Sequence, residues 1–515
     1  MKVKQFRESM IDRLVSGVEE GQRMRSMHER AGLRSLHRSV SRRQLLRIGG
    51  LGSLGLTLPA LLRAEADKPS LEQVQRAPGV LRPIRSCILI FHYGGPSHID
   101  LYDMKPNAPA EIRGQFSSIA TSVPGIRVCE HLSQTARVMD RLAIVRSMHH
   151  PMTNHNAAAF TALCGRDPLK GDLELLSNDR NDPPCYGAIM SANMRERPGL
   201  PTFVALPHVM YNVVQLPGQV AGFLGSAHGP FQVNADPSAP DFHMGELELP
   251  GDLSLDRLDN RARLLGLIDD QRAQASALAE AAIRTAGNGP TRITAGAKTG
   301  DRLGPDPRDV YTEKAFRLLH SPTVRQAFDL GSEGPKLRDR YGRNKLGQSA
   351  LLARRLVEAG VRFVTVYDGQ HNGQTANWDA HENVFGRLKN DLVPPADQSF
   401  AALIEDLSGR GLLDETLVIA MGEFGRTPKI NGNAGRDHWP NCYSIILAGG
   451  GIRGGVTYGS SDKMGAYPDS DAVSPADLAA TLFWRFGLDP VREMADLTGR
   501  PYKLADGQPI KTLFA

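Results

Sequence analysis

The sequence has little cysteine, and no two of its cysteines have the spacing of a structural zinc site. Its 515 residues include five cysteines, none of them in a CxxC pair, which excludes a zinc-ribbon module. Since five is an odd number, at least one thiol has no disulfide partner within the chain. Cys87 lies in an apolar run, so we expect it to act as a small core residue. The chain also contains no internal repeat.

The chain has no excess of positive charge beyond its N-terminus. The formal net charge is +5, but residues 1–66 alone carry a net +7, which leaves the remainder slightly acidic. Nucleic-acid binding by the body of the protein is therefore not expected. A content of 41% hydrophobic and 23% charged residues is ordinary for a soluble globular protein. The length allows several domains or one large α/β domain.

The N-terminal apolar run is too short for a comfortable membrane span. Ile48–Leu62 has 15 residues and is rich in glycine. It follows the pair Arg42-Arg43 and precedes Ala64-Glu65-Ala66, a small-residue cleavage pattern. Residues 1–66 therefore read as a twin-arginine export leader cleaved near Ala66. This predicts the twin-arginine translocase as a partner, a periplasmic or secreted destination, and no stable transmembrane helix after cleavage. The alternative is an uncleaved N-terminal anchor.

Residues 67–515 alternate apolar runs with helical patterns, as a single α/β domain would. Runs that are apolar on both faces predict buried, mostly parallel strands, at Ile84–Phe91, Leu142–Arg146, Val361–Tyr367, Thr416–Met421 and Tyr443–Ala448. Helices are expected at Asn156–Cys164, Leu346–Ala359, Ala396–Leu407 and Pro475–Phe486. The loop-rich segments around 181–250 and 286–307 read as insertions between core elements.

Acidic, basic and imidazole side chains follow the run Thr416–Met421. They are Glu423, Arg426, Asp437 and His438, and ligands of open α/β sheets bind beyond the carboxyl ends of the strands. Glu423 and Arg426 could instead form an ordinary ion pair, and Asp437 could cap a helix.

Three other predicted strands also end in loops that carry candidate residues. Asp100 follows the first strand, as a metal ligand or as an Asx-turn residue. Thr153 and His155 precede a helix, where free N–H groups favour an anion or a nucleophile. Asp379 and His381 form an Asp-x-His pattern that suits Zn²⁺ or a similar divalent ion, with Ca²⁺ and Mg²⁺ as alternatives.

Several stretches resemble the bacterial family called domain of unknown function 1501. They include GGPSHIDLYDMKP, VRSMHHPMTNH, NWDAH, LLDETLVIAMGEFGRTPKIN and AGRDHWP, and the resemblance covers nearly all of the chain. That family is regarded as similar to the alkaline phosphatase and sulfatase superfamily. The resemblance implies a three-layer α/β/α sandwich, a pair of divalent metals and a nucleophile at a helix N-terminus.

The resemblance assigns roles to particular positions. Thr153 or His155 takes the place of the nucleophile, and Asp379 and His381 match the aspartate and histidine of one metal site. His438 matches the last metal histidine. Glu423 and Phe424 stand where the superfamily has an Asp-His pair, which is a departure from a two-zinc phosphatase site. Type I sulfatases mature a residue in a C/S-x-P/A-x-R motif, and no cysteine here has that context, since Cys164-Gly165-Arg166 does not fit.

These predictions lead to one functional hypothesis and one alternative to it. The hypothesis is an exported, metal-dependent hydrolase of phosphate or sulfate esters, acting on a small molecule or a polysaccharide. Its metal ligands would be Asp100, Asp379, His381, Glu423, Asp437 and His438. His155 or Thr153 would face the substrate, and Arg426 or Arg436 would hold an oxyanion. The rival is a non-catalytic exported binding or surface-assembly protein on the same scaffold.

Overall fold

The computed structural model describes residues 81–197, 199–245, 316–369 and 377–514, with scattered positions between 256 and 278. Leu81–Ala515 forms one compact unit. The expected leader and the segment 286–307 lie outside the described residues. Within the described part of the chain, no helix combines the length and the apolar character needed to cross a membrane.

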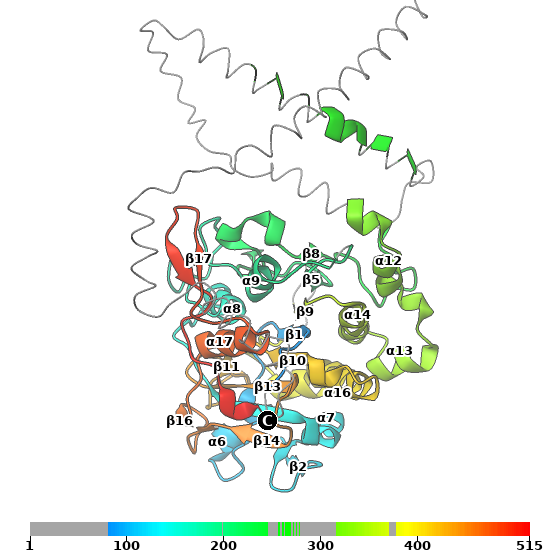
Figure 1. Cartoon of the computed structure of the whole chain (residues 1–515). Coiled ribbons are helices and arrows are strands. Elements are labelled where there is room, and N and C mark those ends of the chain that lie inside the picture. The colour runs from blue at the N-terminus through cyan, green and yellow to red at the C-terminus, as the bar shows by residue number, and fades with distance from the viewer. Residues whose placement is uncertain are drawn as a thin grey trace, which may run out of the picture. The chain divides into compact units, whose positions relative to one another are not determined.

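The described residues contain a central sheet of eight strands (Figure 1). Its spatial order is β14 (Val456–Tyr458), β4 (Leu142–Met148), β13 (Tyr443–Gly449), β10 (Thr416–Met421), β1 (Ser86–His92), β9 (Phe363–Asp368), β5 (Phe203–Leu206) and β8 (Phe231–Gln232). Both pairings of β13 are antiparallel, and the other five pairings are parallel. The predicted mostly parallel sheet is therefore confirmed.

Helices cover both faces of this sheet. One face packs against α7 (Ser133–Arg137), α12 (Pro322–Phe328), α13 (Pro335–Tyr341), α14 (Lys345–Ala359) and α16 (Val393–Gly409). The other packs against α8 (His155–Cys164), α9 (Tyr186–Asn193) and α17 (Pro475–Arg485). Side chains alternate along each strand, so Ile88 and Ile90 of β1 enter the first core whereas Leu89 and Phe91 enter the second. The predicted three-layer α/β/α sandwich is confirmed.

The predicted elements exist with small changes at their ends. The strand at Thr416–Met421 has the predicted limits, whereas the strand predicted at Val361 begins at Phe363. The helix α14 ends at Ala359 and is capped by Gly360, whose φ of 112° is the left-handed conformation that glycine adopts readily. All five cysteines are buried and free.

The strand directions bring four loops to one edge of the sheet, those that follow β1, β4, β9 and β10. The strands β1, β9 and β10 are parallel, and β4 points the same way because it and β10 are both antiparallel to β13. The carboxyl ends of these four strands therefore share an edge, and β13 begins there. The loops at that edge carry the residues that the sequence singled out.

Candidate metal centre

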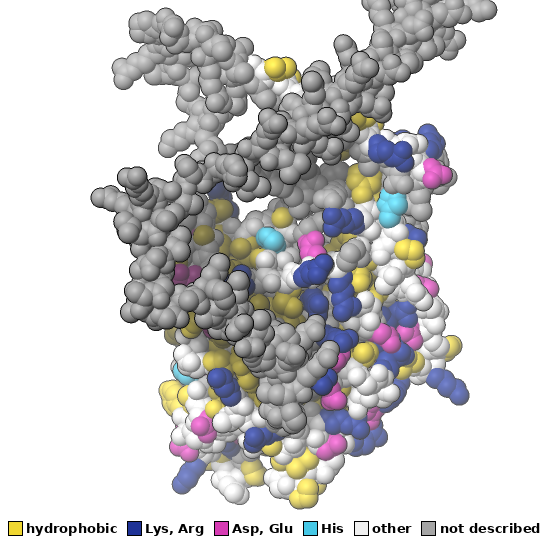
Figure 2. Space-filling view, viewed as in Figure 1, with side chains coloured by type: hydrophobic (Ala, Val, Ile, Leu, Met, Phe, Trp, Pro, Cys, Tyr) yellow, Lys and Arg dark blue, Asp and Glu magenta, His cyan; other side chains and the backbone are white. Residues whose placement is uncertain are grey.

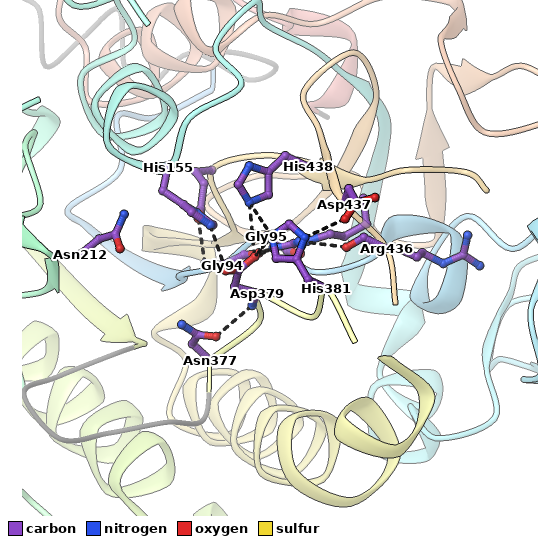
Figure 3. Close-up of polar contacts among 12 residues, drawn as sticks. Gly94, Gly95, His155, Asn212, Asn377, Asp379, His381, Arg436, Asp437 and His438 are labelled. Atoms are coloured by element: carbon purple, nitrogen blue, oxygen red, sulfur yellow. Dashed lines mark hydrogen bonds and ion pairs between the residues drawn. The ribbon is translucent and has the colours of Figure 1, made fainter. Parts of the chain in front are cut away.

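Three histidines and one aspartate converge at this edge of the sheet (Figure 3). His155, Asp379, His381 and His438 each offer one ligand atom, and these four atoms lie within 4.8 Å of one another. The described residues thus contain a group that could hold a metal ion. Asp379, His381 and His438 were predicted as ligands, whereas His155 was predicted to face the substrate.

Separate elements deliver the four side chains. His155 is the first residue of α8, which follows β4. Asp379 and His381 lie in the loop after β9. His438 begins the short strand β12 (His438–Trp439), which pairs with β11 (Gly425–Arg426) after β10. The cluster therefore depends on the sheet that holds β4, β9 and β10 in register.

The Asp379 carboxylate is the centre of the cluster. Its Oδ1 lies 2.9 Å from His381 Nε2 and 3.4 Å from His438 Nε2. Its Oδ2 lies 3.3 Å from His155 Nε2. His381 Nε2 and His438 Nε2 are 3.0 Å apart. Four-coordinate zinc with bonds of about 2.0–2.2 Å has ligand atoms separated by roughly 3.3–3.6 Å, which is close to these separations.

Each imidazole also makes a hydrogen bond through Nδ1, the ring nitrogen that does not contact Asp379. His155 Nδ1 lies 2.7 Å from Glu423 Oε1, and His381 Nδ1 lies 2.8 Å from Asp437 Oδ1. His438 Nδ1 lies 2.9 Å from the backbone oxygen of Thr153. Because all three partners are acceptors, each Nδ1 carries the hydrogen and donates it. In the neutral rings the three Nε2 lone pairs then face the cluster, as in histidines that bind metals.

Two contacts inside the cluster are unfavourable without a cation. His155 Nε2 is buried and makes no well-formed hydrogen bond, despite its distance of 3.3 Å from Asp379. His381 Nε2 and His438 Nε2 face each other as two acceptors if both rings are neutral. A divalent ion would satisfy all three nitrogens. The donor set of three imidazoles and a carboxylate therefore fits a metal such as zinc.

The electrostatics keep the central carboxylate ionised. Burial would raise the pKa of Asp379, but contacts with His155, His381, His438 and Arg426 hold that pKa well below its usual range. Burial lowers the pKa of His155, but its contacts with Asp379 and Glu423 outweigh burial and raise that pKa to about 9. Asp379 raises the pKa of His381, whereas burial lowers the pKa of His438.

Glu423 supports the cluster from the interior. Its side chain is fully buried, and its Oε1 accepts hydrogen bonds from His155 Nδ1 at 2.7 Å and from the backbone N–H of Gly94 at 2.8 Å. Its Oε2 has no hydrogen-bond partner. Glu423 therefore contacts a cluster histidine and does not belong to the group of four.

Arg426 is buried beside Asp379. One terminal nitrogen lies 2.5 Å from Asp379 Oδ1 and also donates to the backbone oxygen of Gly94. The remaining nitrogens donate to the backbone oxygens of Gly95 and Arg436. The guanidinium therefore ties Asp379 to the turn after β1.

Two glycines let that turn approach the cluster. Gly94 and Gly95 have φ values of 107° and 76°, which side chains rarely adopt. A Cβ on Gly94 would lie 2.2 Å from the backbone nitrogen of Asp379. The Gly-Gly turn after β1 is thus a place where two backbones meet.

Asp100 and Arg436 form their own pair away from the group of four. Both side chains are fully buried, and Arg436 binds the carboxylate with Nε at 2.7 Å and a terminal nitrogen at 2.9 Å. Ser97 donates to the same carboxylate at 2.6 Å. The guanidinium also donates to the backbone oxygens of Ile112, Thr427 and Pro428. The structure does not bring this pair to the cluster.

Thr153 and Asp437 lie at the rim. The Thr153 hydroxyl donates to Asp172 at 2.6 Å, and its backbone oxygen accepts from His438. The Asp437 carboxylate, whose side chain is 52% exposed, contacts His381 Nδ1. Asp437 thus reaches a ligand candidate from outside.

Aromatic rings close the inner side of the cluster. The centroid of the Phe424 ring lies 5.0 Å from that of His155 and 4.6 Å from that of His438. The Tyr93 ring lies 5.1 Å from that of His155. Sequence reasoning missed Tyr93 and Asp172. The position of Tyr93 directly before the Gly-Gly turn was a usable signal, whereas no local pattern marks Asp172.

A separate cavity of about 620 Å³ lies beside the same loop between β4 and α8. Its lining includes His149, His150, Arg166 and Tyr502, but none of the four cluster residues. The four converging side chains therefore lie outside this cavity, and we place the candidate site at the cluster.

Comparison with known proteins supports the family expected from the sequence. A model of the family described as protein of unknown function (DUF1501) matches residues 84–514. No curated protein matches the chain. Three similar solved structures are a sulfatase, a phosphonate monoester hydrolase and an alkaline phosphatase.

All three likenesses are distant. The PsFucS1 sulfatase from Pseudoalteromonas sp. is 14% identical, with 84% of this chain and 72% of that chain covered and a TM-score of 0.34. The phosphonate monoester hydrolase from Silicibacter pomeroyi is 11% identical, with coverages of 84% and 76% and a TM-score of 0.34. The alkaline phosphatase from the Antarctic bacterium TAB5 is 13% identical, with coverages of 73% and 95% and a TM-score of 0.30. The assignment of the site rests on its geometry and not on these likenesses.

Proposed function

Since the chain belongs to the family of proteins of unknown function DUF1501, we propose from the geometry of its cluster that it is a metal-dependent hydrolase of phosphate or sulfate esters. The observation that carries the proposal is the convergence of three imidazole Nε2 atoms on one carboxylate. Each imidazole has an acceptor at Nδ1, so the chain supplies both ligands and the groups that orient them.

A divalent ion held there, proposed to be zinc, would polarise an ester oxygen and lower the pKa of a nucleophile or water. The chain's own residues set the direction of approach. His381 and Asp437 are the more exposed part of the site, with side chains 43% and 52% exposed, whereas His155 is 6% exposed. The substrate therefore reaches the cluster from the side of His381.

Thr153 is the hydroxyl that we propose to face the substrate. It is exposed at the start of α8, and its hydroxyl donates to Asp172, which is the arrangement of a side-chain nucleophile with a carboxylate partner. Arg426 holds Asp379 rather than an oxyanion, because its nitrogens all donate to protein oxygens. Arg436 is likewise engaged by Asp100.

These hydrogen bonds within the protein also favour one rival function, that of a non-catalytic exported binding protein. Among the described residues discussed for the site, the Thr153 hydroxyl and both guanidinium groups are already bonded within the protein. In that case the cluster would bind a metal without cleaving esters.

The proposal includes export by the twin-arginine route to the periplasm or the exterior. It is supported by Arg42-Arg43, the short apolar run and the Ala64-Glu65-Ala66 pattern. We expect N-terminal sequencing of the exported protein to begin near Asp67. Retention of residues before Arg42 in the exported protein would instead indicate an anchor.

Hydrolysis assays on the exported protein test the function. Metal-free protein is supplied with Zn²⁺, Ca²⁺ or Mg²⁺ and assayed on p-nitrophenyl phosphate, p-nitrophenyl sulfate and sulfated polysaccharide. We expect metal-dependent cleavage that His438→Ala abolishes and His149→Ala, a change in the same edge loops but outside the cluster, retains. Bound metal without cleavage of any ester would support the binding protein.

A further inference from the structure

The resemblance implied a pair of metal ions, but the arrangement of the side chains supports a single ion. We propose that the cluster binds one divalent ion per chain, an inference that rests on the proposed metal site. His155 is the third imidazole ligand of that ion, and Glu423 is the residue that positions His155. The proposal concerns the chain's own residues and can be tested without measuring catalysis.

The surroundings of His155 assign it to the ion rather than to the substrate. Its Nδ1 is occupied by Glu423 at 2.7 Å, so Nε2 is the atom available to the cluster. That Nε2 is buried, lacks a hydrogen-bond partner and lies 3.3 Å from Asp379 Oδ2. A buried polar nitrogen without a partner is costly, and a cation between His155 and Asp379 would remove that cost.

Each carboxylate that could complete a second metal site already has at least one partner in the protein. Both Asp100 oxygens are bonded to Arg436, and the pair is fully buried. One Glu423 oxygen is bonded to His155 and to the backbone of Gly94. Asp437 contacts the outer nitrogen of His381.

An apolar ring occupies the position where the resemblance implied another ligand histidine. Phe424 packs on the rings of both His155 and His438, with centroid distances of 5.0 and 4.6 Å. It therefore fills the inner side of the cluster with carbon atoms. In the described part of the chain, the group of His155, Asp379, His381 and His438 is the set whose ligand atoms converge.

Glu423 differs from the other groups that hold an imidazole. Its carboxylate is fully buried, whereas the Asp437 side chain is 52% exposed. A buried carboxylate needs a charged or hydrogen-bonding partner, and His155 and Gly94 are the groups that supply it. Replacing Glu423 therefore changes the hydrogen bond that orients His155, and hence the strength of His155 as a ligand.

Metal titration of the exported protein tests the number of bound ions. Metal-free protein is titrated with Zn²⁺ and with Co²⁺, whose visible spectrum reports the type and number of its ligands. We expect one ion per chain. Two ions per wild-type chain would overturn the proposal.

Substitutions test the roles of the two residues. We expect Glu423→Gln, which keeps the shape of the side chain, to weaken binding by about 10–100-fold and to alter the Co²⁺ spectrum while the count stays at one. His155→Ala should weaken binding further, whereas Asp437→Asn should have a smaller effect because its carboxylate is exposed. The control His149→Ala should match the wild type. An unchanged affinity and spectrum in Glu423→Gln would overturn the positioning role.

Nuclear magnetic resonance of the wild type covers the case in which His155→Ala does not fold. Nitrogen-15 shifts of the zinc-loaded protein should show three histidines bound through Nε2, and two such histidines would overturn the role of His155. The outcomes also separate this inference from the proposed function. One bound ion without ester cleavage would refute only the function, and two bound ions with cleavage would refute only this inference.

Discussion

His155 and Glu423 are 268 residues apart in the sequence, yet Nδ1 of one lies 2.7 Å from Oε1 of the other. Each follows a strand that ends at the same edge of the sheet, β4 for His155 and β10 for Glu423. The contact therefore links the outer layer that contains α8 to the central sheet. It also couples the geometry of the cluster to the integrity of the fold, which leads to the following predictions.

Metal binding should stabilise the folded chain. A ligand that binds only the native state at 100 times its Kd adds about 2.7 kcal/mol to the free energy of unfolding. We expect added Zn²⁺ to raise the Tm of the wild type and a chelator to reverse the change, as measured by calorimetry. The Tm of His438→Ala should not respond to either addition, and an equal response in that variant would contradict the ligand assignment.

Gly94→Ala should destabilise the protein strongly. The new Cβ would lie 2.2 Å from the Asp379 backbone nitrogen, and the residue keeps a φ of 107°. Gly125→Ala is the matched control, since its φ is 87° but nothing lies within 4 Å of the new Cβ. We expect the control to lose about 1 kcal/mol and Gly94→Ala to lose more, measured by urea unfolding. Equal losses would mean that the close approach is unimportant.

Asp100→Asn should lower stability without removing the metal. Removing one partner of a buried ion pair leaves the Arg436 charge uncompensated and costs about 3–5 kcal/mol. We expect denaturant unfolding to show that loss while the metal content stays at the wild-type value. Asp339→Asn, which breaks the exposed pair with Arg343, should cost less than about 1 kcal/mol. Loss of metal from a folded Asp100→Asn protein would return Asp100 to the ligand set.

Asp172 should make stability depend on pH in the acidic range. Burial raises its pKa, but hydrogen bonds from Thr153 and Asn154 outweigh burial and lower that pKa in the folded state. Since the folded pKa lies below the unfolded value of about 3.9, the stabilisation is present above about pH 4 and is lost as the pH falls through the folded pKa.

Thermal unfolding of Asp172→Ala beside the wild type checks this dependence. We expect a gap in Tm at neutral pH that narrows below about pH 4, because the wild type then loses the charge that the variant lacks. A gap that stays constant down to the acid limit would show that the carboxylate charge has no part in holding the start of α8.

The fold could be predicted because its strands are apolar on both faces. Thr416–Met421 and Tyr443–Gly449 are buried runs that local sequence defines, and their alternation with helices indicates a sandwich. The direction of β13 could not be predicted in the same way. A buried run reads alike in either direction, and the loop before it sets which way the chain returns.

Part of the site could be predicted because its residues lie in loops next to the ends of buried strands. Asp379, His381 and His438 follow or precede buried strands, and the structure brings them together. The pairing of Asp100 with Arg436 and the contact of Glu423 with His155 depend on distances across the sheet. A sequence shows that these residues lie near one edge, but not which acidic group meets which basic group.

The five free cysteines can be used to measure how often the folded protein opens. Burial raises the pKa of Cys87 and Cys164, and it raises that of Cys129, Cys185 and Cys442 to about 12. Nucleophilic attack needs the thiolate, so a maleimide added to the native protein meets almost none. The rate of alkylation then measures how often the interior becomes accessible, and Cys129 and Cys164 report on opposite cores of the sandwich.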